Sequence, residues 1–201
     1  DGIRDYKVTG VQTCALPIYY IDVYNSTASN AEVQFSIAYG DVDGYGAPTL
    51  TQTDSSTLST TATYYQYRNV LLDSGDPLFS VYYSSSAAGI VEGGYDIRNF
   101  YAININRARY KERLDPGNIS LTLSGSVRNI TLIDDSGGTN ENITTAGRVY
   151  NIVSGSLNIG TATTASINSR VAPNGQGYGL FFPDMGIILL NRSEEHTSEL
   201  Q

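Results

Sequence analysis

The chain has 201 residues, with 20 acidic and 12 basic side chains and a formal net charge of −8. This acidic balance argues against a general nucleic-acid binder, because such proteins usually carry a basic face. No run of about 18 apolar residues is present, so the sequence predicts no membrane-spanning helix.

Both ends of the chain resemble translated adapter DNA. Residues 192–201 correspond to the codons AGA TCG GAA GAG CAC ACG TCT GAA CTC CAG, which resemble the indexing adapter of short-read sequencing libraries. Residues 8–18 resemble the complementary strand of that adapter, and residues 1–5 its outer part. Segments of this kind are set aside before fold is considered. We therefore expect one natural β-rich domain at residues 19–191, flanked by adapter-derived residues 1–18 and 192–201 that pack poorly.

This division decides which chemistry the natural segment can perform. Cys14 is the only cysteine and His196 the only histidine, and both lie in the adapter-like ends. Residues 19–191 can therefore form no Cys-His dyad, no Ser-His-Asp triad and no thiolate or histidine zinc site. We predict no catalytic residue, no cofactor and no metal site. Because Met185 is its only methionine, we expect this segment to be an internal fragment of a longer protein.

The first half of the segment predicts a hairpin, a loop and a helix. Tyr20–Tyr24 and Glu32–Tyr39 alternate apolar and polar residues, which is typical of half-buried strands joined by a turn. Glycine and proline residues disfavour regular secondary structure in Gly40–Asp54, so this segment is predicted to be a loop. A helix is predicted from Leu58 to about Leu72, with N-caps at residues 54–56. Its predicted apolar stripe consists of Leu58, Ala62, Tyr65 and Leu72, with Arg68 on the other side.

The second half predicts mainly strands. Leu78–Tyr83 and Phe100–Ile105 read as strands, and Ser84–Gly94 as a surface loop. Residues 107–114 fit a single helical turn or a polar edge, and residues 115–117 fit a tight turn. Further strand signals lie at residues 119–123, 127–132, 149–153 and 180–190. The predicted fold is therefore mainly β with one helix, as an antiparallel sandwich or barrel-like domain, with α+β as the alternative.

Two Asp-Ser-Gly triplets, which begin at Asp73 and Asp135, bear on enzymatic function. Aspartic proteases use two such motifs, because two carboxylates that share a proton can activate water. The separation of the triplets is short for two lobes, and Asp-Ser-Gly is also a favourable turn sequence. We predict turns, and an aspartic-type hydrolase is the remote alternative.

The segment Asp41-Val42-Asp43-Gly44 suggests a calcium loop, since a hard cation prefers clustered oxygens. Tyr45 and Gln52, however, stand where a further oxygen ligand and the bidentate glutamate of a helix-loop-helix site belong. We therefore predict an ordinary loop and leave a bound calcium near Asp41 and Asp43 as an open alternative.

One basic cluster is present, and it consists of Arg107, Arg109, Lys111 and Arg113. It predicts either a docking surface or a solvated segment balanced in part by Glu112 and Asp115. We take the four cations as the candidate inter-subunit surface.

Four stretches carry a family resemblance, at Tyr64–Leu72, Tyr101–Asn118, Gly147–Gly155 and Tyr178–Ile187. They resemble virion structural proteins of marine tailed, myovirus-like phages, of the tail or baseplate type. The resemblance implies a non-enzymatic subunit located in the virion, with other virion proteins as partners in an oligomeric assembly. It implies no membrane, specific nucleic acid or small molecule as partner, and it carries no active-site residues.

The composition of the segment agrees with this interpretation. Abundant tyrosine with few charges suits contact surfaces, because tyrosine buries a large amphipathic area at low entropic cost. The alternative is a receptor-binding or carbohydrate-binding module of a phage fibre, which stacked tyrosines around a groove would favour.

Overall fold

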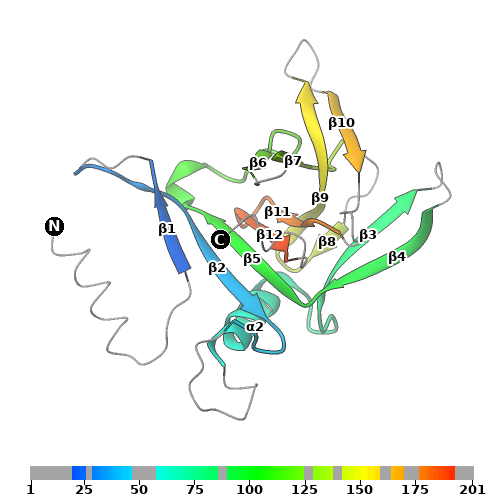
Figure 1. The fold of residues 1–201 in the computed structure, drawn as a ribbon, viewed down its shortest axis with the longest axis horizontal. Coiled ribbons are helices and arrows are strands. Elements are labelled where there is room, and N and C mark those ends of the chain that lie inside the picture. Colours follow the sequence, from blue (N-terminus) through cyan, green and yellow to red (C-terminus); the bar gives the residue numbers. More distant parts are fainter. Residues whose placement is uncertain are drawn as a thin grey trace.

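The computed structural model describes residues 20–25, 29–46, 58–85, 90–124, 129–137, 142–158, 164–169 and 177–192. The described part is mainly β with one α-helix, as predicted (Figure 1). A ten-stranded antiparallel sheet curls into a half-barrel, so the barrel-like alternative of the predicted fold is the one found.

The described elements follow one another along the chain as β1 (Tyr20–Tyr24), β2 (Val33–Asp41), α2 (Ser59–Leu71), β3 (Phe79–Ser85), β4 (Ile90–Ile97), β5 (Asn99–Ile105), the 3-10 helix η2 (Arg107–Arg109), β6 (Ser120–Ser124), β7 (Asn129–Asp134), β8 (Asn142–Thr144), β9 (Gly147–Asn158), β10 (Thr164–Ser169), β11 (Gly179–Phe182) and β12 (Ile187–Asn191). The order in the large sheet is β1-β2-β5-β12-β11-β9-β7-β6, and β8 and β10 also pair with β9. Strands β3 and β4 form a separate ribbon.

The predicted hairpin at the start of the segment is confirmed. β1 and β2 pair in antiparallel fashion, with Ile21 opposite Ile37 and Val23 opposite Phe35. β2 continues through Gly40 and Asp41, which the sequence had placed in a loop. Glycine is needed at position 40 because α2 packs close to the sheet there. A Cβ at this position would lie 2.9 Å from the Phe100 ring and 3.1 Å from the Cα of Tyr64.

The predicted helix is present, but its buried face was predicted wrongly. Residues 54–56, the expected N-caps, lie outside the described residues, and Leu58 occupies the N-cap without a side-chain hydrogen bond. Tyr64 and Leu71 are fully buried, whereas Tyr65 is 43 % exposed. Tyr64 packs against Phe100 of the sheet, and its hydroxyl donates to the carbonyl oxygen of Ile97, the last residue of β4, at 2.6 Å. A polar tip with a partner allows a tyrosine to be buried completely.

The predicted loop at residues 84–94 is wrong over much of its length. β4 spans Ile90–Ile97 and pairs with β3, while residues 86–89 lie outside the described part. Cross-strand hydrogen bonds satisfy backbone groups whatever the side chains are, so small residues such as Gly93 and Gly94 can enter a strand. The strand signal at residues 180–190 corresponds to the hairpin of β11 and β12. Strands β8 and β10 were not predicted from the sequence.

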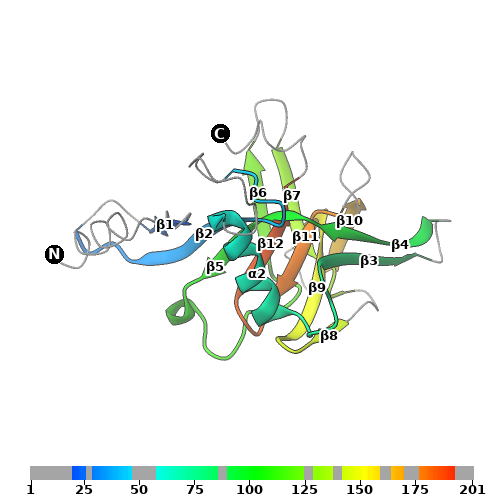
Figure 2. The ribbon, with the colours of Figure 1, turned by 90° about the horizontal axis from the view of Figure 1, so that it is seen from below.

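Apolar side chains cover both faces of the half-barrel. One cluster lies on the convex face, where α2 and the β3–β4 ribbon pack against the sheet (Figure 2). It contains Tyr64, Phe79, Phe100 and Phe182, all fully buried. A second cluster lies on the concave face and includes Ile103, Tyr150, Phe181 and Ile188. The sheet therefore has the hydrophobic pattern of a layer that is covered on both sides.

The buried Tyr64 predicts a loss of stability in alkali. Burial raises the pKa of Tyr64 from 10.0 to about 12, so the folded state favours the neutral hydroxyl. The stabilisation is complete below pH 10 and is lost as the pH rises to 12. A shift of this size corresponds to about 2–3 kcal/mol. Urea denaturation between pH 8 and pH 12 measures the free energy of unfolding at each pH. In Tyr64→Phe this free energy should fall less steeply as the pH rises. An equally steep dependence in Tyr64→Phe would contradict this assignment.

Candidate functional site

The concave face of the half-barrel is the candidate site, because apolar residues cross it from strand to strand in register. Ile21 in β1 lies opposite Ile37, which lies opposite Ile103 in β5. The same row continues through Ile188 and Phe181 to Tyr150 in β9. At the other end of the sheet, Leu121 and Leu123 of β6 lie opposite Leu132 and Ile130 of β7. Because side chains of one parity share a face, all these residues line the inside of the curl.

Coverage of this face decreases from the middle of the sheet towards β1. Phe181 and Ile188 in the middle are buried, whereas Ile21 in the edge strand β1 is 69 % exposed. Six further residues, in β2, β5, β7 and the edge strand β6, are half-buried and pack against the concave cluster, namely Phe35, Ile37, Ile105, Ile130, Leu121 and Leu123. A contiguous apolar surface with its margins in water is typical of an interaction site.

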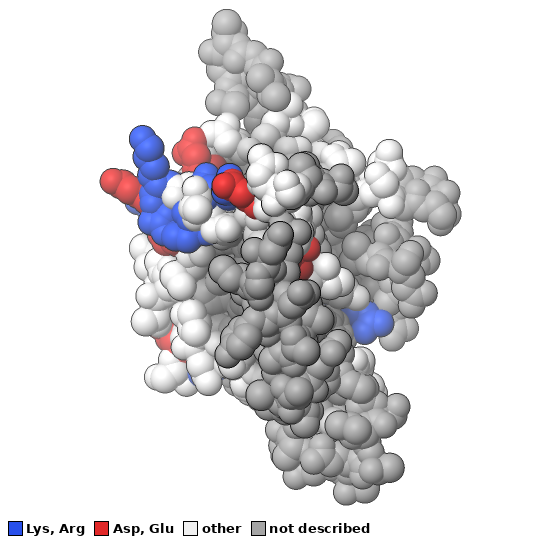
Figure 3. Space-filling view, turned by 90° about the vertical axis from the view of Figure 1, so that its left-hand side faces the viewer, with Lys and Arg blue, Asp and Glu red and all other residues white. Residues whose placement is uncertain are grey.

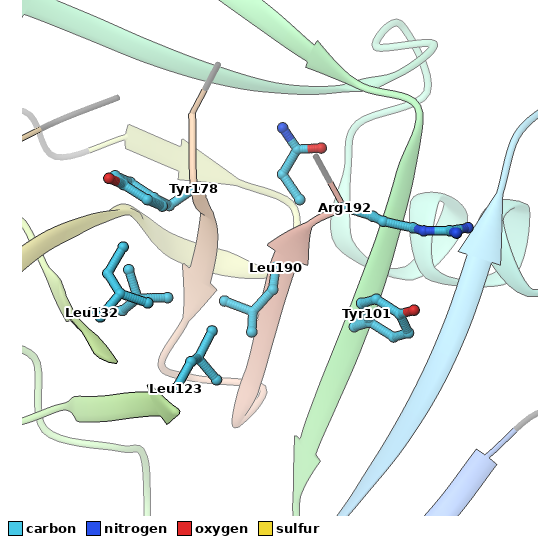
Figure 4. Close-up of a pocket in the computed structure, with 8 residues that line it drawn as sticks. Tyr101, Leu123, Leu132, Tyr178, Leu190 and Arg192 are labelled. Atoms are coloured by element: carbon cyan, nitrogen blue, oxygen red, sulfur yellow. The ribbon is translucent and has the colours of Figure 1, made fainter. Parts of the chain in front are cut away.

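A pocket opens on this face between β6–β7 and β5–β12 (Figure 4). Its walls are formed by Tyr101, Leu123, Ile130, Leu132, Tyr178, Leu190, Asn191 and Arg192. The polar residues at the rim are already engaged, since Asn191 Nδ2 donates to the carbonyl oxygen of Gly177 at 2.9 Å. The Arg192 side chain points away from Leu190, and its Nη1 donates to the hydroxyl of Tyr39 at 2.8 Å. The pocket therefore presents chiefly apolar surface to a partner.

Arg192 departs from the expectation that the adapter-like ends pack poorly. Its guanidinium lies 5.3 Å from the centre of the Tyr39 ring, in a cation–π contact. Burial raises the pKa of Tyr39 to about 12, against the opposing effect of Arg192, so its hydroxyl is neutral and also donates to Asp41 Oδ2 at 3.2 Å. The other residues of the ends, 1–18 and 193–201, lie outside the described residues.

The four cations of the basic cluster lie together on one exposed loop, with acidic side chains beside them (Figure 3). Residues 107–109 form the predicted single helical turn, as a 3-10 helix. Arg107 is held over the Tyr110 ring at 4.4 Å and donates to the carbonyl oxygen of Tyr110 at 2.8 Å. Arg109 forms an ion pair with Glu32 in the β1–β2 connection. These two arginines therefore organise the loop itself.

Lys111 and Arg113 are the two cations of the basic cluster that make no polar contact of their own with the described residues. Both are exposed, and no hydrogen bond or ion pair joins either side chain to another described residue. The loop that carries them is fixed at Tyr110, whose hydroxyl donates to the carbonyl oxygen of Met185 at 3.1 Å. Lys111 and Arg113 are the two members of the predicted surface that can meet a partner without first breaking internal contacts.

The Asp41–Gly46 segment uses its carboxylates internally. Asp41 Oδ1 accepts hydrogen bonds from the backbone N–H groups of Asp43 and Tyr45, at 2.8 and 3.1 Å. Asp43 forms an ion pair with Arg98 at 2.8 Å. Among the described residues, no three His, Cys, Asp or Glu side chains come together in a group able to hold a metal ion. The geometry of this segment is that of an Asx-type turn, and residues 47–54 of the predicted loop lie outside the described residues.

The two Asp-Ser-Gly triplets lie on separate turns, as predicted. Asp73 is exposed after α2 and accepts a hydrogen bond from the hydroxyl of Thr145. Asp135 is buried after β7, where its carboxylate accepts from the backbone N–H and the side-chain amide of Asn151 at 2.8 and 2.9 Å. The two carboxylates have different partners in different parts of the fold. A dyad that shares one proton requires the two groups to touch, and this arrangement does not support one.

Comparisons of the chain with protein-family models, with curated proteins and with solved structures gave no match. Within the described residues, no helix has both the length and the apolar character needed to cross a membrane.

Proposed function

We propose that this chain is a non-enzymatic structural subunit of a phage virion, of the tail or baseplate type, which acts by packing against neighbouring proteins. The observation that carries the proposal is the apolar concave face, which runs in register from β1 to β9 and is half-exposed at its margins. Removing an apolar face of this kind from water lowers the free energy, so its burial against a partner protein is favourable. The resemblance of the four stretches Tyr64–Leu72, Tyr101–Asn118, Gly147–Gly155 and Tyr178–Ile187 to tailed-phage structural proteins supports the virion as the location.

The concave pocket also bears on the carbohydrate-binding alternative. Tyr101 and Tyr178 supply aromatic surface to the pocket wall. Sugar recognition, however, requires several polar groups that converge on the ligand. The other walls of the pocket are leucine and isoleucine, and Asn191 and Arg192 are engaged elsewhere. The pocket therefore favours an apolar protein side chain over a sugar, and glycan-array binding by the chain would reverse that order.

Particle proteomics tests the location directly. We expect the tryptic peptides Asn99–Arg107 and Leu114–Arg128 in tailed-phage particles purified by density gradient from seawater. Major capsid peptides in the same fractions serve as the positive control. If these two peptides occurred only in the particle-free supernatant, the virion proposal would be wrong.

Substitution in the pocket tests whether the concave face is an accessible apolar site. We expect Leu123→Asn to reduce the binding of the apolar dye bis-ANS severalfold, because the substitution places an amide in the pocket wall. Val70→Asn is the matched control, since Val70 is an exposed apolar residue on the outer side of α2. Fluorescence titration of both variants provides the measurement. Equal losses in the two variants would contradict a dedicated concave site.

Charge reversal tests the basic cluster as a second packing surface, which remains a proposal. We expect Lys111→Glu combined with Arg113→Glu to weaken self-association about tenfold at low salt, because exposed charges steer and orient partners. Adding Arg107→Glu and Arg109→Glu should abolish it. Arg98→Glu, at an exposed cation elsewhere, is the control. Sedimentation velocity measures the effect, and an unchanged profile for the fourfold reversal would remove this surface from the interface.

A further inference from the structure

In the part of the chain that the structure describes, the continuous strand path of the half-barrel ends in two strands, β1 and β6, and these two strands are similar to each other. β1 and β6 stand at the two ends of the continuous strand path, and within the described residues each pairs with a strand on one side only. Both contain five residues that alternate, as Tyr-Ile-Asp-Val-Tyr in β1 and Ser-Leu-Thr-Leu-Ser in β6. An unpaired edge with this pattern is a template for a further strand.

The apolar residues of both edges lie on the same face of the sheet. Ile21 and Val23 pair with Ile37 and Phe35, which belong to the concave cluster. Leu121 and Leu123 also pack against that cluster. A strand pair formed by β1 and β6 would therefore continue the apolar concave surface without interruption.

The strand directions allow this pair between two copies of the chain. Every neighbouring pair along β1-β2-β5-β12-β11-β9-β7-β6 is antiparallel, and the path holds an even number of strands. β1 and β6 consequently run in opposite directions. A second copy rotated about the axis of the curl presents its β1 antiparallel to the β6 of the first, which is a head-to-tail contact of the kind that closes rings.

Charge selects this pairing over a pairing of β1 with another β1. Asp22 is the central residue of β1, so two antiparallel β1 strands aligned at their centres would place Asp22 opposite Asp22. Like charges directly opposite each other are destabilising. In a β1–β6 pair, Asp22 lies opposite Thr122, the central residue of β6. A β6–β6 pair would leave Ile21, which is 69 % exposed, uncovered at the other edge.

We propose that β1 of one copy adds to β6 of the next copy, so that the half-barrels join into one continuous apolar-lined sheet. This inference rests on the proposed packing function and names its partner as a second copy of the chain.

Site-directed cross-linking of the full chain tests the pairing. One preparation carries Asp22→Cys and another Thr122→Cys, both with Cys14→Ser, and a short bismaleimide is added to each and to their mixture. We expect a cross-linked dimer chiefly in the mixture, because residues directly opposite each other across a strand pair have Cβ atoms about 5 Å apart. A dimer formed as readily in either single preparation, or no dimer in the mixture, would overturn the proposal. Ser156→Cys, exposed on β9, serves as the control for random collision.

A charge cycle tests the same contact by association. Thr122→Asp places a carboxylate opposite Asp22 and should raise the dissociation constant of self-association about fivefold. Adding Asp22→Lys creates an opposite-charge pair and should return the dissociation constant to the value of the unsubstituted chain. The melting temperature of each variant confirms folding, and Ser156→Asp controls for added charge. A loss without rescue would count against the β1–β6 contact.

The two proposals fail in different ways. Self-association that is unaffected by Thr122→Asp, together with peptides found in purified particles, would preserve the packing function and remove the β1–β6 pairing. Absence of the peptides from particles would remove the virion proposal whatever the cross-linking result.

Discussion

Replacing Gly179 with alanine is expected to lower the free energy of unfolding by about 4 kcal/mol, as the sum of a backbone clash and an unfavourable conformation. Gly179 has φ +152°, and a Cβ there would lie 1.9 Å from the carbonyl oxygen of Leu189 and 3.1 Å from the Cα of Leu190. Both atoms belong to the backbone of the paired strand, so no side-chain rotation can relieve the contact.

The measurement for Gly179→Ala is thermal unfolding followed by circular dichroism. A loss of this size corresponds to a fall of about 8–16 °C in melting temperature for a chain of this length. Gly75→Ala is the matched control, because a Cβ at Gly75 meets nothing within 4 Å. Melting temperatures that fell equally in the two variants would show that β11 and β12 do not pair as described.

Phe100→Ala is expected to cost about 4 kcal/mol, through lost burial and the cavity that remains. Phe100 is fully buried on the convex face of β5. Its ring centre lies 5.3 Å from that of Tyr64 and 5.5 Å from those of Tyr67 and Phe79. The substitution therefore removes a central member of the aromatic cluster that joins α2 and β3 to the sheet.

Urea denaturation measures the effect of Phe100→Ala. Tyr65→Ala is the control of similar size, because Tyr65 lies on the outer side of α2 and is 43 % exposed. We expect this control to cost less than about 1 kcal/mol, as surface substitutions usually do. If the two substitutions had equal effects, the buried face of α2 would be assigned wrongly.

Local patterns allowed most strands to be predicted, because alternation of apolar and polar residues is a property of each short segment. The pattern of β6, with Leu121 and Leu123 between serine and threonine, is an example. Turn chemistry was equally readable at Asp73 and Asp135. Each of these predictions depended on neighbours within a few residues.

The rest depended on contacts between distant parts of the chain. The face of α2 was misjudged because Tyr64 packs against Phe79 and Phe100 and donates to the carbonyl oxygen of Ile97, contacts that no local pattern shows. β4 was missed because its partner β3, and not its glycine-rich composition, makes it a strand. The alternation of apolar residues in β1, β2 and β6 predicts which side chains of each strand share a face. The curl that brings these strands around one concave surface, however, depends on the strand order of the whole sheet.

That order has a consequence for biosynthesis. β11 and β12 are the last described strands in the chain, yet they lie in the middle of the sheet, between β9 and β5. A nascent chain that has not yet reached residue 179 can form β1-β2-β5 and β9-β7-β6 only as two disconnected pieces, each with an extra unsatisfied margin. The two pieces can join only through the final hairpin, so we expect the chain emerging from the ribosome to expose unpaired strand edges until residues 179–191 have been made.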